Sequence, residues 1–221
     1  MSRRVVVYPD TNVLYPYYIS DLLRWLASDG VVRLVWTQYL VDEVIDVVPR
    51  RRLTRDVGRD ERSVRSQWDA ARAHLKRDEV SEAQWRTKMS LTTGPDADDH
   101  PHQAAAIYAQ ADYLLTHDSR GFPVGPLREQ GVTVTSVDDF LCGILAEQRD
   151  DVLDTVQNRA RSLKHPPMTL ERYLETLTLP APRFAELAAR ASDTHLSRLA
   201  RLRARLRRKS YLRRSAIKRQ P

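Results

Sequence analysis

Short apolar runs alternate with amphipathic segments along the first two thirds of the chain. The runs are short enough, and bounded by enough turn-forming residues, to predict buried strands. They lie at 5–8, 31–35, 113–115 and 132–134. Strands separated by helical segments are typical of an α/β fold, in which a parallel sheet is flanked by helices.

Helical spacing is clearest after Thr37, which we expect to be a helix N-cap. The apolar residues that follow it at this spacing are Leu40, Val41, Val44, Ile45 and Val48. Further helices are predicted at 21–27, 103–110 and from 137 to about 148. The stretch from Arg50 to Leu91 is very polar, with apolar residues at wide intervals, and predicts two or three surface helices. Those apolar residues are Val57, Val64, Trp68, Leu75, Val80 and Trp85.

Charge divides the chain more sharply than its net value of +7 suggests. Residues 1–150 hold 19 basic and 23 acidic side chains, whereas residues 151–221 hold 17 and 6. We therefore expect two parts, an α/β domain at 1–148 and a helical, basic C-terminal extension at 149–221. Eleven basic residues and no acids lie between Arg198 and Arg219, a pattern that favours contact with a polyanion. A solvated basic helix, docked by its leucines, is the simpler interpretation of the same stretch.

Two features of the sequence bear on the cellular location of the protein. Cys142 is the single cysteine, so an internal disulfide is excluded, and a small buried apolar role is expected for it. No apolar stretch approaches the roughly 20 residues of a membrane span, and no signal-peptide core is evident. We expect a cytoplasmic protein that does not enter a membrane.

Four acidic residues occupy comparable places in the predicted strand–helix units. Asp10 and Asp118 follow strands, Glu43 lies one turn inside a helix that follows a strand, and Asp99 precedes a helix. Ligands of parallel sheets bind beyond the carboxyl ends of the strands, so the four side chains are expected to converge. Clustered carboxylates favour Mg²⁺ or Mn²⁺, which would activate water for phosphodiester hydrolysis. Neither a glycine-rich nucleotide loop nor a Ser-His-Asp arrangement is evident.

In their order and spacing, several segments resemble the PIN domain, and within it the VapC toxins of toxin–antitoxin pairs. The resemblance covers roughly residues 4–147. The matching segments are 6–14, 41–44, 96–99 with 104–106, 113–123, 131–134 and 138–141.

This resemblance implies a PIN-like (Rossmann-like) sheet and a Mg²⁺- or Mn²⁺-dependent endoribonuclease. It implies that Asp10, Glu43, Asp99 and Asp118 are the catalytic metal ligands. It also implies an RNA substrate, a cognate antitoxin protein and a homodimer. Residues expected beside the ligands are Thr11, Asn12, Asp98 and Thr116; those expected to hold RNA phosphates are Arg50, Arg51, Arg120, Arg207 and Arg208.

Some alternatives remain open at this level. Asp98 competes with Asp99 and Asp46 with Glu43, while Asp96 is expected to be a loop or capping residue. His100 and His102 have no third ligand nearby for zinc, and are expected at the surface. A catalytically weak RNA-binding or partner-binding protein, or a housekeeping RNA-processing nuclease, would share most of these features.

Overall fold

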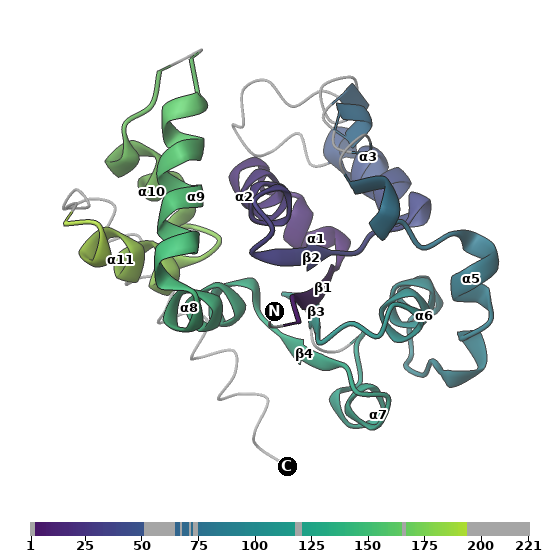
Figure 1. Cartoon of the computed structure of the whole chain (residues 1–221). Helices are drawn as coiled ribbons and strands as arrows, with labels where there is room; N and C mark the ends of the chain where they lie inside the picture. Colours follow the sequence, from purple (N-terminus) through teal and green to yellow (C-terminus); the bar gives the residue numbers. More distant parts are fainter. Residues whose placement is uncertain are drawn as a thin grey trace. The chain divides into compact units, whose positions relative to one another are not determined.

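Figure 1 shows the chain as a computed structural model, which describes residues 3–50, 65–66, 68–70, 72, 75–117, 121–164 and 167–193, without the side chains of 47–50. Two compact units divide the chain, residues 1–136 and 137–221. The boundary expected after residue 148 stays a prediction.

The first unit is built on four parallel strands (Figure 1). They are β1 (Val5–Pro9), β2 (Val32–Leu34), β3 (Tyr113–Leu115) and β4 (Thr133–Thr135), in the order β2-β1-β3-β4. All three pairings are parallel. The predicted α/β fold with a parallel sheet is confirmed.

Strand β1 lies inside the sheet, and Val7 and Tyr8 have no exposed surface. A central parallel strand is covered on both faces, which is why it is almost entirely apolar. The chain passes from β1 to β2 on one side, while β3 lies on the other, with Pro9 in register with Leu115. Strand order therefore reverses between β1 and β3, and their carboxyl ends form the edge at which such sheets bind ligands.

Helices of the first unit connect these strands. They are α1 (Thr11–Leu14), α2 (Tyr17–Ser28), α3 (Gln38–Arg50), α6 (His100–Tyr108) and α7 (Val124–Glu129).

Two of these helices show how local chemistry sets a helix start. The predicted cap of α3 is confirmed, since the Leu40 amide donates to Thr37 Oγ1 at 3.0 Å. Helix α6 begins three residues earlier than expected. Pro101 lies in its first turn, where the missing amide hydrogen has no cost.

The polar stretch after α3 was predicted to form two or three surface helices. Its described part contains the short helices η1 (Lys76–Asp78), α5 (Glu82–Arg86) and η2 (Met89–Leu91). Helix α5 lies at the surface, with four of its five residues exposed. The described apolar positions of this stretch point inward, since all four are buried: Trp68, Leu75, Val80 and Trp85. Val57 and Val64 lie outside the described residues.

Contacts after β2 account for this burial. The Val80 amide donates to the Trp36 carbonyl at 2.8 Å, and the rings of Trp36 and Trp68 lie 5.9 Å apart. Widely spaced apolar residues therefore fill one core from separate short elements.

Four helices form the described part of the second unit: α8 (Val137–Glu147), α9 (Arg149–Ser162), α10 (Leu170–Leu177) and α11 (Pro182–Ala191). Asp138 accepts a hydrogen bond from the Phe184 amide at 2.9 Å and so ties α8 to the start of α11. The predicted helical character of this region is confirmed. The basic tail, including Arg207 and Arg208, lies outside the described residues. Among the described helices, none combines the length and apolar character that a membrane span requires.

Candidate active site

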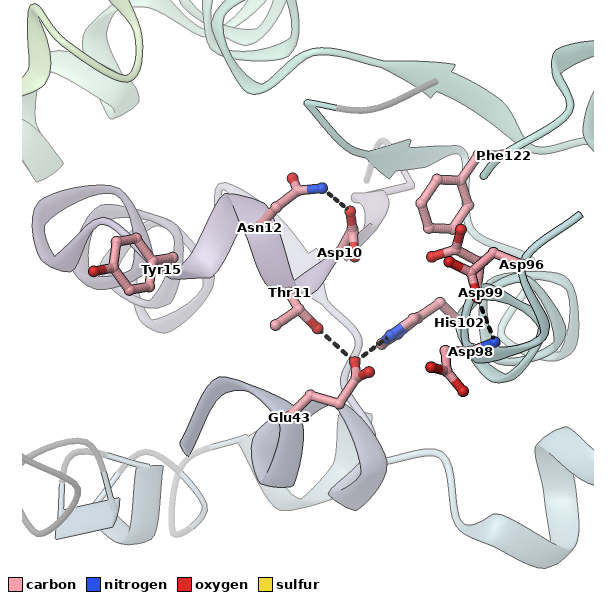
Figure 2. Close-up of a pocket in the computed structure, with 10 residues that line it drawn as sticks. All are labelled: Asp10, Thr11, Asn12, Tyr15, Glu43, Asp96, Asp98, Asp99, His102 and Phe122. Carbon is pink, nitrogen blue, oxygen red and sulfur yellow. Dashed lines mark hydrogen bonds and ion pairs between the residues drawn. The ribbon is translucent and has the colours of Figure 1, made fainter. Parts of the chain in front are cut away.

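A pocket of about 270 Å³ lies in the first unit, and five acidic residues contribute to its lining (Figure 2). They are Asp10, Glu43, Asp96, Asp98 and Asp99. Three of the four acids singled out from the sequence are thus brought to one pocket. They arrive from separate elements: the end of β1, helix α3 and the start of α6.

Asp10 is the most buried of these acids, with 5% of its surface exposed. Its backbone amide donates to the Leu115 carbonyl at 2.8 Å, which continues the pairing of β1 with β3. Its side chain forms no hydrogen bond that caps α1, although Asp10 occupies the N-cap position. Burial raises the pKa of Asp10, while the nearby His102 and a hydrogen bond from Thr116 act in the opposite direction. The carboxylate is therefore held in place at an electrostatic cost.

Two neighbouring side chains orient Asp10. Thr116 Oγ1 donates to Asp10 Oδ2 at 2.8 Å, and the amide of Asn12 donates to the same oxygen. Asn12 Oδ1 in turn accepts from the backbone of His117 at 3.0 Å. Asn12 and Thr116 join the carboxyl ends of β1 and β3 around Asp10.

Glu43 extends from α3 and is held by two donors on one oxygen. Thr11 Oγ1 donates to Glu43 Oε2 at 2.7 Å, and His102 Nε2 lies 2.6 Å from the same atom. Burial alone would raise the pKa of Glu43, but hydrogen bonds from His102, Thr11 and Tyr39 lower it below its ordinary value. Glu43 is consequently an ionised acceptor whose rotation is set by its neighbours (Figure 2).

Asp99 ends the short helix η3 (Ala97–Asp99) at the start of α6. Burial, together with the charges of Asp10 and Asp96, raises the pKa of Asp99 to about 6. Asp98 also lines the pocket but is exposed, and its backbone carbonyl accepts from Tyr39 at 3.3 Å. Asp99 is thus the neighbour that shares the electrostatic environment of Asp10.

The carboxyl group of Asp99 packs against Gly121. A Cβ atom at residue 121 would overlap Asp99 Oδ2 and lie 2.6 Å from its Cγ. Real Cβ atoms do not approach other atoms this closely, so only glycine leaves Asp99 in its present position. This requirement was not predicted from the sequence.

His102 is where the sequence prediction fails. It was expected at the surface, yet only 1% of it is exposed. Its Nδ1 lies 2.9 Å from the hydroxyl of Tyr8 and its Nε2 contacts Glu43. The available signal was its spacing of three residues from Asp99, which puts both on one face of α6. His100 is only partly buried and lies 3.3 Å from the Gly94 carbonyl.

Several predicted site residues fall outside the described part of the chain. Asp118, Arg120 and Arg51 are among them, as is the side chain of Arg50. Their proposed roles therefore remain predictions.

The donor chemistry of the pocket suits a hard cation. Its acidic side chains offer only oxygen ligands, which is the preference of Mg²⁺ and Mn²⁺. Within the described ranges, which omit Asp118, no three His, Cys, Asp or Glu side chains form a group able to hold a metal ion. Mg²⁺ commonly binds through one or two carboxylates, water and substrate phosphate, so a ready cage of three is not required. The charge of Asp10 raises the proton affinity of Asp99, and a cation near these groups would relieve this repulsion.

Two family models match the chain. One, described as a PIN domain, matches residues 4–120, and the other, described as the VapC50 C-terminal domain, matches residues 137–190. The first covers more than half of the chain and includes every described residue of the pocket except Phe122. No curated protein and no solved structure gives a significant match.

Proposed function

Because the chain belongs to the PIN-domain family, we propose that it is a divalent-metal-dependent endoribonuclease, acting as the toxin of a toxin–antitoxin pair. The observation that carries this proposal is the gathering of Asp10, Glu43 and Asp99 in one pocket within the matched region. PIN domains are generally nucleases. The VapC50 C-terminal match over residues 137–190 favours a toxin over a housekeeping RNA-processing nuclease.

In this proposal Asp10, Glu43, Asp99 and Asp118 hold Mg²⁺ or Mn²⁺. The bound cation would supply charge neutralisation at the scissile phosphate and lower the pKa of an attacking water. Asp10 and Asp99 offer carboxylates that would benefit from a positive charge, because burial and the charges of other acids raise the pKa of both: Glu43 acts on Asp10, and Asp10 and Asp96 act on Asp99.

The remaining residues of the pocket orient these acids. Thr116 and Asn12 hold one oxygen of Asp10, and Thr11 holds Glu43. This support fixes the direction from which each carboxylate faces the substrate, so that little reorganisation is needed during the reaction. Asp98, exposed at the pocket, is proposed to act beside Asp99 rather than in its place.

The proposed partners are RNA, a cognate antitoxin and a second copy of the chain. Arg50, Arg51, Arg120, Arg207 and Arg208 are proposed to bind RNA phosphates. If they do, RNA affinity will fall steeply with salt, because each neutralised phosphate releases counterions.

The test is cleavage of labelled RNA by the purified chain with Mn²⁺ or Mg²⁺ and with EDTA. Asp10→Asn should reduce cleavage by several orders of magnitude, since it removes a charge at the point of metal binding. Asp42→Asn is the matched control, because Asp42 lies next to Glu43 but contacts Gln38 on the outside of α3. Cleavage that persists in EDTA and in Asp10→Asn would refute the mechanism.

The toxin role requires its own experiment. Induced expression of the wild-type chain should stop bacterial growth, whereas Asp10→Asn should not. Normal growth with an active, well-expressed nuclease would favour a processing enzyme. Salt-dependent RNA binding without any cleavage would favour a catalytically weak binding protein.

A further inference from the structure

His102 is a buried histidine for which the proposed reaction has no direct use. It comes from α6 and bridges two other elements, β1 through Tyr8 and α3 through Glu43. Its ring is almost completely enclosed, at 1% exposure, so both ring nitrogens depend on these two partners.

The chemistry of the partners determines the direction of one hydrogen bond. A carboxylate can only accept, so Nε2 of His102 must carry the hydrogen that points to Glu43 Oε2, 2.6 Å away. On the other side, the Tyr8 hydroxyl can donate to Nδ1 or accept from it. The bond to Glu43 therefore has the same direction whichever charge state the imidazole adopts.

Tyr8 is itself fixed. Its side chain has no exposed surface, and its hydroxyl lies 3.3 Å from Thr37 Oγ1, the cap of α3. The contacts thus run from Thr37 at the start of α3, through Tyr8 and His102, to Glu43 six residues further along the same helix. Rotation of His102 would break its hydrogen bonds to both Tyr8 and Glu43 inside a buried environment, which costs free energy.

We propose that His102 is a positioning residue which, held by Tyr8, fixes the rotation of the Glu43 carboxylate toward the pocket. This rests on the proposed role of Glu43 as a metal ligand. Partners of metal-ligating carboxylates commonly matter for metal affinity in this way. His102 lies at the wall of the pocket but offers no carboxylate to a cation; it acts through Glu43.

Four variants test this proposal. His102→Leu removes the donor and keeps an apolar volume, whereas His102→Gln retains an amide donor that can reach Glu43. Tyr8→Phe removes one oxygen from the support of the ring. His100→Gln is the control, because His100 contacts the Gly94 carbonyl and not Glu43.

Mn²⁺ binding by calorimetry is the main measurement, beside kcat and KM for RNA cleavage and the melting temperature. We expect His102→Leu to weaken Mn²⁺ binding about 10–100-fold and to lower kcat more than it raises KM. His102→Gln should recover most of both losses, Tyr8→Phe should lie between them, and His100→Gln should match wild type. Equal losses in His102→Gln and His102→Leu, or wild-type Mn²⁺ affinity in a folded His102→Leu, would overturn the proposal.

A second measurement distinguishes failure of the positioning role from failure of the proposed nuclease function. ¹⁵N spectra of the histidine rings in the metal-free protein report whether Nε2 of His102 is protonated, without any turnover. The positioning role is supported if Nε2 is protonated in the wild type and its hydrogen exchanges with solvent faster in Tyr8→Phe. This holds even if the wild-type chain cuts no RNA. An unprotonated Nε2 would refute the role even in an active nuclease.

Discussion

Gly121→Ala should inactivate the proposed nuclease through Asp99 alone. The backbone of Gly121 does not require glycine, since its φ lies outside the range from +20° to +160°. The consequence of the substitution is therefore a contact between side chains and not backbone strain.

The size of the displacement follows from the distances. The new methyl would lie 2.6 Å from Asp99 Cγ. Carbon atoms in contact prefer roughly 3.5–4.0 Å, so the carboxyl group must move by about 1 Å or more. A misplacement of about 1 Å can cost on the order of 100-fold in rate, and we expect a loss of this size in kcat/KM.

Labelled-RNA cleavage at saturating Mn²⁺ is the assay, with Gly125→Ala as the matched control. A Cβ at Gly125, in α7, meets nothing within 4 Å, so activity should be unchanged and stability equal or higher. The double variant Gly121→Ala/Asp99→Asn should be no worse than Asp99→Asn, because both changes remove the same interaction. Additive losses, or a folded Gly121→Ala with wild-type activity, would refute the reasoning.

Two predictions concern stability. In EDTA at pH 7.5, Asp99→Asn should raise the free energy of unfolding by about 1 kcal/mol, a value reduced for solvent screening of the half-exposed carboxyl. Folding raises the pKa of Asp99 to about 6, so its contribution to stability is greatest below its unfolded pKa and is lost as the pH rises through 6. Asp99→Asn should lose this pH dependence of the free energy of unfolding. An unchanged pH profile in the variant would contradict the prediction. Gln103→Leu should cost about 3 kcal/mol in urea unfolding, because the buried amide bonds both backbone groups of Thr93 and the Gly121 carbonyl. A cost below about 1 kcal/mol would show that these groups find other partners.

Local rules were sufficient for the sheet and for three of the acids. Runs of apolar residues identify strands, and an acid directly after a strand must lie at its carboxyl end. Asp10 follows a strand in this way, Glu43 lies in the helix after a strand and Asp99 precedes a helix. Convergence was predicted from these three positions, and the pocket contains all three residues. Local rules do not separate Asp99 from Asp98, since adjacent residues obey the same rule, and both line the pocket.

The apolar residues between Arg50 and Leu91 are too widely spaced to show what they pack against. Trp68 and Trp85 are both buried. Their burial comes from elements that lie apart in the chain, such as the pair of Trp36 with Trp68. The spacing of apolar residues gives information about one helix or strand at a time, and not about contacts between separate elements.

The chain by itself determined a PIN-like α/β domain with acids at its strand ends and a helical C-terminal part. Tertiary structure alone decided that His102 meets Glu43, 59 residues away, and that Asp99 rests on Gly121. Charge and the spacing of apolar residues are properties of residues close together in the chain, so they can be read from the sequence. A hydrogen bond between two helices, or a carboxylate lying where a Cβ would be, exists only once distant segments have packed together.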